Sequence, residues 1–332
     1  MALTKNLTYQ LLLCLLFLLA GGCGGKDKNN KINSAELAAQ KAAGVCVSGN
    51  CKDGTGVWQY NDGRRYEGSF IAGRPGGEGT VYLPSGSAFS GKFKYGQYDG
   101  QGDVVYANGI NAECQKGNCL DGRGILMFLD GSRYSGEFKN EMQSGYGGLE
   151  LEDGSTYSGN FADNLYHGEG TLTRADGATY QGVFKKGNLD GEAHIRFAAG
   201  HQFMGTFKDG KLIEDQGRVF FPNNTRSSCI DGNCIDGEGK LALDNGASYQ
   251  GGFLNCSRHG YGVYKFESGA IYKGMFLKGK HHGQGLYIYP SGITYEGDYK
   301  DGERHGRGRF TFPNGTSYDV LYRRGKLVEK RL

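Results

Sequence analysis

Several features common in globular proteins are scarce in this sequence of 332 residues. It has 5 Pro and a single Trp, and no apolar run approaches the roughly 20 residues that a membrane-spanning helix requires. Segments without Gly are short, because 60 residues are Gly, so helical bundles and doubly wound α/β folds are disfavoured. The formal charge is only +3, which gives the molecule as a whole no general reason to seek nucleic acid.

Aromatic residues, by contrast, are abundant. The chain has 22 Tyr and 18 Phe, which are too many for a solvated disordered chain. Short strands separated by Gly-containing turns fit this composition best. We therefore predict an all-β protein.

The amino terminus predicts export from the cell. A basic residue precedes an apolar run at residues 11–20, and small residues lead to Cys23, as in a secretory signal peptide. Cys23 resembles the lipidated cysteine of a bacterial lipoprotein, although Ala20 stands where such signals usually have Leu, and ordinary cleavage at this bond is the alternative. We expect a signal peptide over residues 1–22, then a lipidated Cys and a flexible tether over residues 23–43. The expected location is the bacterial cell envelope, lipid-anchored on the periplasmic or surface side of the outer membrane, or secreted if Cys23 is not lipidated.

A repeat of mostly 23 residues fills the chain from residue 44 onward. Its clearest element is aromatic-x-Gly-x-aromatic, in which the two rings and the Gly face the same side of a strand. Three further units lack the rings, which makes twelve units and a final half-unit at Tyr318. The nine clear units begin at Tyr66, Phe89, Tyr134, Tyr157, Tyr180, Phe203, Tyr249, Tyr272 and Tyr295.

Each unit is predicted to be a β-hairpin. Asp-Gly and Asn-Gly pairs, such as Asp130-Gly131 and Asn314-Gly315, supply the positive φ angles of tight turns. One hairpin buries too little apolar surface to fold alone, so the units must stack. We predict an elongated single-layer antiparallel sheet of about twelve tandem hairpins over residues 44–332, capped by the last half-unit.

The sequence of landmarks in a unit, Y-x-G-x-F, a Gly, then G-x-G, resembles the MORN (membrane occupation and recognition nexus) repeat. The resemblance covers about residues 44–322. It implies membrane association, protein scaffolding or self-association, and it brings no common catalytic residues. Phe often replaces the Trp that the family prefers, and the three units without rings depart further from the pattern.

The three units without rings hold six of the nine cysteines. Each has Cys, four residues ending in Gly-Asn, and a second Cys. In an exported protein these pairs favour local disulfides, each worth about 2 kcal/mol, in place of the missing ring packing. A structural zinc site is the alternative, but it normally needs four ligands, and the pairs are too far apart to share one ion. The predicted disulfides are Cys46–Cys51, Cys114–Cys119 and Cys229–Cys234.

No other residue pattern indicates a catalytic or cofactor site. Cys256 replaces a turn Gly and is a free thiol, an intermolecular link or, as the favoured interpretation, a plain surface residue. Four His residues precede G-x-G at the same place, so a turn or surface role is favoured over a metal site. We therefore expect no enzyme activity, no metal and no cofactor. These four residues are His167, His259, His282 and His305.

Charge is distributed unevenly along the repeats. Residues 134–179 contain eight acidic and two basic side chains, whereas residues 272–332 contain twelve basic and six acidic ones. The basic end is either a solvated surface or a contact for an acidic protein or anionic lipid. The candidate partner-binding residues are Arg304, Arg307, Arg309, Arg323 and Arg324.

The function predicted from these features is a non-enzymatic, envelope-tethered scaffold or adaptor that binds proteins through its repeats. The alternatives are a binder of anionic lipid or cell-wall polymer, and a hydrolase with an unrecognised site. An aromatic face open to solvent would favour polymer binding, whereas a collapsed aromatic core would favour scaffolding. Expected partners are the membrane through the lipid anchor, an unknown protein or anionic lipid, and a second copy of the chain, but not nucleic acid.

Overall fold

The computed structural model describes residues 43–213, 217–223 and 225–331, and these residues form strands and turns without a helix. Twenty-seven strands belong to one antiparallel sheet, which confirms the predicted all-β fold of tandem hairpins. The chain divides into two compact units. The first comprises the described residues up to Glu152 together with Asn160–Leu165, and the second comprises Asp153–Gly159 together with the residues from Tyr166 onward.

The first unit begins with five hairpins. Their strands are β1 (Gly44–Gly49), β2 (Gly54–Tyr60), β3 (Arg65–Ile71), β4 (Arg74–Tyr82), β5 (Ala88–Lys94), β6 (Gln97–Val105), β7 (Asn111–Gly117), β8 (Gly122–Phe128), β9 (Arg133–Lys139) and β10 (Met142–Glu150). Residues of both units contribute to the next two strands, β11 (Thr156–Ala162) and β12 (Leu165–Thr173).

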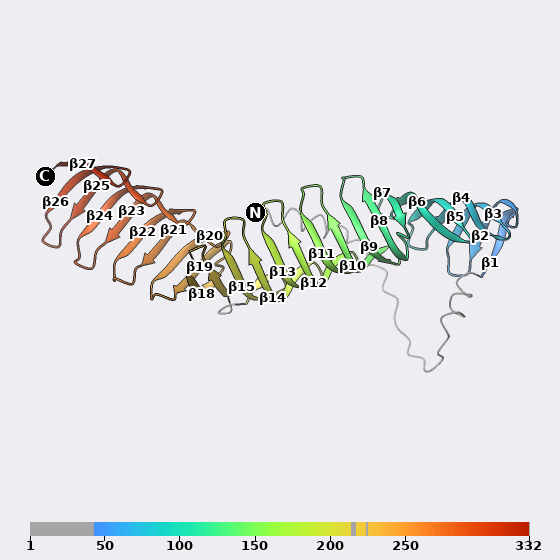
Figure 1. The fold of residues 1–332 in the computed structure, drawn as a ribbon, viewed down its shortest axis with the longest axis horizontal. Coiled ribbons are helices and arrows are strands. Elements are labelled where there is room, and N and C mark those ends of the chain that lie inside the picture. The colour runs from blue at the N-terminus through green and yellow to red at the C-terminus, as the bar shows by residue number, and fades with distance from the viewer. Residues whose placement is uncertain (1–42, 214–216, 224, 332) are drawn as a thin grey trace, which may run out of the picture. The chain divides into compact units, whose positions relative to one another are not determined.

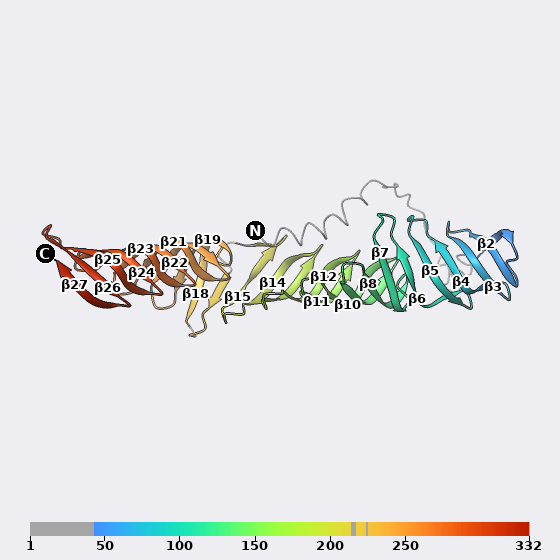
Figure 2. The same cartoon turned by 90° about the horizontal axis from the view of Figure 1, so that it is seen from above.

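The second unit continues with the remaining hairpins, whose strands follow one another in chain order (Figure 1). Its strands are β13 (Thr179–Lys185), β14 (Asn188–Arg196), β15 (Gln202–Lys208), β16 (Lys211–Leu212), β17 (Gly217–Phe220), β18 (Arg226–Gly232), β19 (Gly237–Leu243), β20 (Ser248–Leu254), β21 (Ser257–Lys265), β22 (Ile271–Leu277), β23 (Lys280–Ile288), β24 (Thr294–Lys300), β25 (Glu303–Thr311), β26 (Ser317–Arg323) and β27 (Lys326–Arg331). Figure 2 shows the same succession from above. The predicted half-unit at Tyr318 forms a hairpin, β26 and β27, with a short second strand.

Two kinds of turn alternate along the sheet. The Gly residues of the Asp-Gly and Asn-Gly pairs have the predicted positive φ, for example 88° at Gly131, but their turns are wider than predicted. Phe128 N donates to Ser132 O at 2.8 Å, and of the residues between them only Gly131 has positive φ. The two-residue turns lie at the other end of the hairpins that carry rings, where both central residues have positive φ, as at Lys278 and Gly279.

In six hairpins a pair of glycines on neighbouring strands makes room for a buried Tyr ring, namely Tyr66, Tyr134, Tyr157, Tyr249, Tyr272 and Tyr295. In β9 and β10, Gly136 lies opposite Gly147, and Tyr134 packs over both. A Cβ on Gly147 would come within 2.5 Å of the Tyr134 hydroxyl and 2.7 Å of its ring. The hydroxyl donates to Glu137 O at 2.9 Å, which fixes the ring in place. The glycines therefore accommodate the ring of their own hairpin.

The rings of successive hairpins form an apolar row on one face, which we call the inner face, and the disulfide hairpins β7–β8 and β18–β19 interrupt this row. In five hairpins the first Tyr lies edge-on between the second aromatic ring of its own hairpin and that of the next; these are Tyr66, Tyr134, Tyr249, Tyr272 and Tyr295. Tyr272, for example, lies 5.2 Å from Phe276 and 5.1 Å from Tyr299, measured between ring centroids. Such T-shaped pairs are favourable and bury a large apolar area. The interlocking rings make each hairpin depend on its neighbour.

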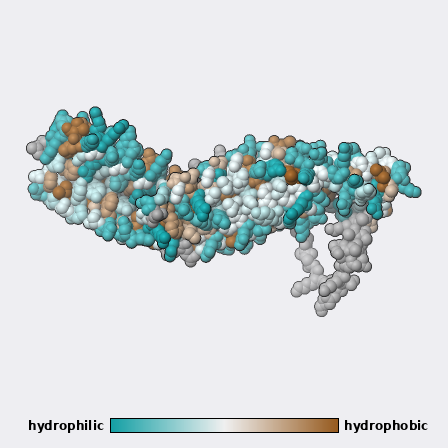
Figure 3. Space-filling view, in the orientation of Figure 1, coloured by the Kyte–Doolittle hydropathy of each residue, from teal (hydrophilic) through white to brown (hydrophobic). Residues whose placement is uncertain are grey.

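Within each unit the sheet curls until its two lines of turns approach each other. In the first unit the Ser85 hydroxyl donates to the Glu141 carboxylate at 2.8 Å, across 56 residues of sequence. In the second unit His201 Nε2 lies 3.4 Å from the Ser257 hydroxyl, again across 56 residues. This curl shields the inner face without a second layer. Figure 3 shows one side of the molecule, on which apolar residues appear as separate patches among hydrophilic ones.

Candidate partner-binding surface

The face opposite the rings, which we call the outer face, carries different side chains in each hairpin. On β21 and β22, Tyr261 lies opposite Met275, with 61% and 43% of their surfaces exposed. On the next strand pair, Lys273 lies opposite Leu286. No repeated residue is required at these positions, because the side chains do not enter the ring row. The outer face can therefore vary without disturbing the core.

The structure separates the five candidate arginines. Arg307 and Arg309 of β25 point to the outer face, opposite Leu321 and Asp319 of β26. Arg309 donates from Nε to Asp319 Oδ1 at 2.7 Å and from Nη2 to Oδ2 at 3.1 Å, and this contact lowers the pKa of Asp319.

Arg307, Arg323 and Arg324 are exposed. In the described chain, no carboxylate forms an ion pair with any of these three. They are the exposed candidates that no carboxylate of the described residues pairs with.

Arg304 lies on the inner face and packs among aromatic rings. Its Cζ is 4.3 Å from the centroid of Tyr295 and 5.1 Å from that of Phe310. It also donates a hydrogen bond to the Tyr289 hydroxyl. Burial opposes the charge of the guanidinium, but the hydrogen bonds to Tyr hydroxyls outweigh it and raise the pKa of Arg304. This Arg therefore belongs to the core of the C-terminal hairpins rather than to a partner-binding surface.

The same core position holds a basic or imidazole side chain in three successive hairpins. Arg258, His281 and Arg304 each lie opposite the second ring of their hairpin. Arg258 Cζ is 4.7 Å from the Tyr264 centroid, and Nη2 donates to Gly279 O at 3.0 Å. This series was not predicted, although its constant place five residues after the second ring of each hairpin is visible in the sequence.

His281 is the titratable member of this series. Its ring stacks on Tyr272 with a centroid distance of 3.7 Å and an interplanar angle of 13°. Phe276 and Tyr299 lie edge-on at 5.3 and 5.6 Å. Burial, and then the charge of Arg258, lower the pKa of His281 to about 4. His281 is therefore neutral at pH 7 and serves as an aromatic core residue.

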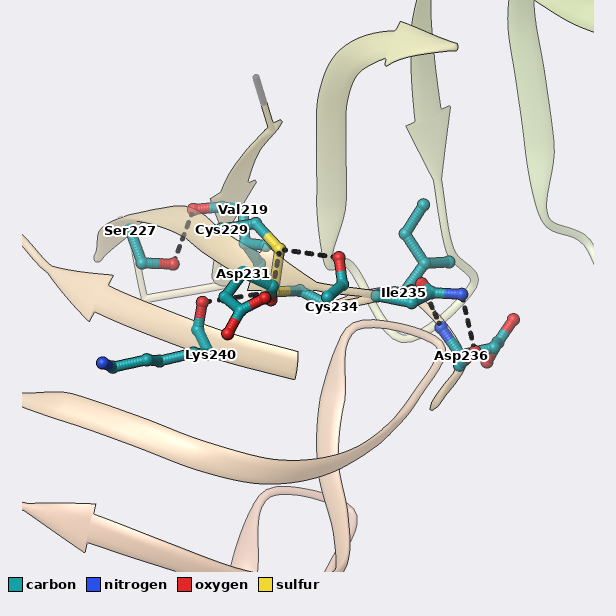
Figure 4. Close-up of a disulfide and its surroundings, with 10 residues drawn as sticks. Val219, Ser227, Cys229, Asp231, Cys234, Ile235, Asp236 and Lys240 are labelled. Atoms are coloured by element: carbon teal, nitrogen blue, oxygen red, sulfur yellow. Dashed lines mark hydrogen bonds between the residues drawn. A yellow bond between two sulfur atoms is a disulfide. The ribbon is translucent and has the colours of Figure 1, made fainter. Parts of the chain in front are cut away.

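The three predicted cysteine pairs lie at bonding distance. The Sγ atoms are 2.05 Å apart in Cys46 and Cys51, 2.00 Å in Cys114 and Cys119, and 2.05 Å in Cys229 and Cys234. The second and third pairs are buried, whereas Cys46 is exposed on β1. Figure 4 shows the third pair beside β18, where the Ser227 hydroxyl donates to Val219 O at 3.4 Å.

The Gly-Asn sequence before each second Cys shapes the short loop that follows. In the second pair, Gly117 has a φ of 79°, and Asn118 Oδ1 accepts hydrogen bonds from the backbone N of Leu120 and Asp121, both at 3.0 Å. Equivalent bonds form at Asn50 and Asn233. The Asn side chain accepts hydrogen bonds from backbone N–H groups of this turn, which explains why it recurs in all three units.

The interpretation of Cys256 as a plain surface residue is wrong. The side chain is buried, although the residue does occupy a turn Gly position, with a φ of 58°. Its backbone N donates to Ile235 O at 2.9 Å in the preceding repeat. Burial raises the pKa of the thiol, which therefore stays protonated and shielded.

The remaining predicted sites are scattered or lie outside the described residues. In the ranges that the structure describes, no three His, Cys, Asp or Glu side chains are close enough to hold a metal ion. The predicted signal peptide, the lipidated Cys23 and nearly all of the tether lie outside these ranges. A search of the described residues finds no helix with the length and apolar character needed to cross a membrane.

A model of the MORN repeat matches seven segments, each of which starts at the first ring of a hairpin. The segments are residues 66–88, 89–110, 134–156, 157–179, 249–271, 272–294 and 295–317. These seven segments are similar to the MORN repeat and together cover just under half of the chain. Two predicted units, which start at Tyr180 and Phe203, lie between the matched MORN repeats and form the same kind of hairpin. The unit that starts at Tyr180 departs from the pattern because Ala193 replaces a Gly opposite Gly182. In the unit that starts at Phe203, β15 pairs with two short strands, β16 and β17.

Similar proteins cover only parts of this chain. An 88-residue stretch is 31% identical to alsin of Rattus norvegicus and of Homo sapiens, and it covers 25% of this chain. The chain thus matches 5% of the length of these relatives. Among solved structures, the TCP10 domain of Danio rerio CPAP has 16% identity and a TM-score of 0.25, covering 62% of this chain and 98% of that one. The SAS-4 (dCPAP) TCP domain of Drosophila melanogaster, in complex with a proline-rich motif of Ana2, has 12% identity and a TM-score of 0.23, covering 53% and 90%.

Proposed function

We propose that this protein is a non-enzymatic scaffold, tethered to the bacterial envelope by a lipid on Cys23, that binds a partner protein through its outer face. The burial of the inner rings supports this proposal most directly. Tyr134, Tyr272 and Tyr295 have 0% of their surfaces exposed. Rings buried to this extent cannot stack on a sugar polymer, so the inner face serves as core and recognition falls to the outer face.

The proposed contact lies on the C-terminal repeats and is centred on Arg307, Arg323 and Arg324. Arg304 is excluded because its guanidinium is engaged with rings, and Arg309 is already paired with Asp319. Free exposed cations attract an acidic partner over roughly 8 to 10 Å at physiological ionic strength, so binding should weaken as salt is added. An acidic protein surface fits these residues best.

Capture from intact bacterial envelopes tests the proposed contact. The full-length chain serves as bait, and a triple variant carries Arg307→Glu, Arg323→Glu and Arg324→Glu. A control with the same change in charge carries Lys92→Glu, Lys116→Glu and Lys139→Glu, three exposed positions in the first unit. We expect the triple variant to lose at least about tenfold of the captured protein, because opposite charges become like charges, and the control to retain it.

Other results would change the proposal in defined ways. Equal capture by both variants would place the contact elsewhere on the repeats. The lipid-binding alternative would be favoured if the wild type captured no protein but bound anionic vesicles, and if the triple variant lost that binding. Turnover of an envelope polymer by the purified chain would overturn the non-enzymatic assignment.

The tether is tested separately with Cys23→Ser. A lipid anchor attached to Cys23 predicts that this variant moves from the membrane fraction to the soluble fraction and loses the mass of the acyl chains. A variant that stays membrane-bound with an unchanged mass would refute the anchor. The capture experiment above would still stand, because the two tests use different residues.

A further inference from the structure

The first strand of the sheet has an edge that no strand of the described residues covers. β1 pairs with β2 on one side, with Cys46 opposite Trp58, and no described strand pairs with its other side. Val45 and Val47 have 61% and 62% of their surfaces exposed. β1 contains no charged residue, so nothing on it opposes the addition of another strand.

Two other strands in the same chain indicate what covers such an edge. β7 and β18 carry the same Cys pattern as β1, and each is paired on the corresponding side by an antiparallel strand. In both cases a Gly lies opposite the first Cys: Gly102 opposite Cys114, and Gly217 opposite Cys229. The missing partner of β1 should therefore be an antiparallel strand that places Gly opposite Cys46.

β1 itself satisfies this requirement. If two copies of β1 pair antiparallel with Val45 opposite Val45, then Gly44 of each copy lies opposite Cys46 of the other. Alternate residues stay on the same face, so the inner faces of the two copies lie on the same side. A two-fold axis perpendicular to the sheet through the Val45 pair generates this arrangement. We propose that the protein forms a symmetric dimer through β1, independently of the partner proposed above.

The other end of the sheet is unsuited to the same pairing. β27 carries Lys326, Lys330 and Arg331 among its six residues, with Glu329 as its only acid. Pairing of two β27 strands would bring these basic side chains close together, and Lys on an edge strand opposes strand addition. Leu327 and Val328 of β27 are exposed to a similar extent as the β1 valines, which makes this strand a matched control.

Charge variants at Val45 test the dimer in the full-length chain. We expect the wild-type mass, measured by analytical ultracentrifugation, to rise toward twice the monomer mass with concentration. Val45→Lys and Val45→Glu should each weaken association at least tenfold, because each places like charges together at the two-fold axis. An equimolar mixture of the two variants should regain the dimer. Val328→Lys on β27 should leave it unchanged.

Fluorescence and circular dichroism distinguish loss of the dimer from loss of folding. Trp58 is the only Trp of the chain and lies beside β1, so its fluorescence should change with concentration in the wild type but not in Val45→Lys. Circular dichroism of the variants should match the wild type if the hairpins remain folded.

Several outcomes would overturn the dimer. These are a wild type that stays monomeric, variants that still dimerise, and a mixture that does not recover. If the wild type is monomeric and dimerises only after deletion of residues 24–42, the preceding segment of the chain covers β1 instead.

Discussion

The neighbouring hairpins β7–β8 and β9–β10 fill the same inner position in different ways. In β9–β10, the Tyr134 ring covers a pair of opposed glycines. In β7–β8, Ala112 stands in the place of this Tyr, and the Cys114–Cys119 disulfide occupies the space. A Cβ on Gly124 of β8 would lie 2.7 Å from Cys119 Sγ. Both fillings are fully buried.

The backbone of the hairpin sets a cavity, and more than one kind of side chain can fill it. The ring fills it through apolar contacts that extend to the next hairpin, including Phe161 at 5.0 Å. The disulfide fills it locally, through a bond between residues five apart. Ring hairpins should therefore couple to their neighbours, and disulfide hairpins should be more self-contained. Substitutions in a ring hairpin and in a disulfide hairpin test this distinction. A third, smaller effect is expected for His281, a ring in the same core.

The largest effect is expected for Gly147→Ala. The added methyl group would overlap the Tyr134 ring, which cannot move away without leaving its neighbours. We expect a loss of about 3 kcal/mol in the free energy of local opening, measured by hydrogen exchange of the β9 and β10 amides.

A double variant separates the overlap from other effects of Gly147→Ala. The three closest atoms to the added methyl belong to Tyr134, so the same change in a Tyr134→Val background should cost less than about 1 kcal/mol. Equal costs in both backgrounds would mean that the ring does not determine the need for Gly here.

A smaller effect is expected when the buried disulfide of β7–β8 is removed by Cys114→Ala and Cys119→Ala. Closure of so short a loop contributes about 2 kcal/mol, and the loss should be confined to β7 and β8 in hydrogen exchange. Removal of the first pair with Cys46→Ala and Cys51→Ala is the matched control at the edge of the sheet, where Cys46 is exposed and Cys51 is buried. An equally large loss in β9 and β10 would contradict the self-contained behaviour of the disulfide hairpins.

The smallest effect concerns His281, which occupies a core position by ring stacking. Its pKa of about 4 lies below the usual value of 6.5, so the unfolded chain binds the proton more readily than the folded protein. The stabilisation that neutral His281 gives to the folded protein is complete above pH 6.5 and is lost as the pH falls toward 4. We expect the stability of the surrounding hairpins to fall by about 1.5 kcal/mol between pH 7 and pH 5.

His281→Phe identifies the source of this pH dependence. The variant keeps an aromatic ring at the position but cannot take up a proton, so it should abolish most of the loss in thermal denaturation scans. His167→Gln, at an exposed position, should leave the loss unchanged. If His281→Phe retains the full acid sensitivity, another group is responsible.

Much of the fold followed from local sequence. The spacing of Tyr134, Gly136 and Phe138 places all three on one side of a strand, because side chains alternate along β-structure. The repetition of this pattern every 23 residues required neighbouring hairpins to cover one another. The cysteine pairs could be predicted for the same reason, since their partners are only five residues apart.

The surface was harder to predict than the fold. Arg304 and Arg309 look alike as basic residues near the end of the chain, but they are five positions apart on β25 and therefore lie on opposite faces of the sheet. Arg304 packs among rings, and Arg309 pairs with Asp319 on the outer face. Charge counts ignore this alternation, so they could not separate these two residues.

The sequence by itself thus determined the hairpins, the order of their pairing, the ring row and the cysteine partners. These features depend on contacts between residues close in the chain or exactly one repeat apart. The tertiary structure was needed to show that the sheet curls until Ser85 reaches Glu141 and that Cys256 is buried. The first contact depends on the accumulated twist of several strands, and the second depends on packing against the preceding repeat, so neither is fixed by the sequence of one repeat.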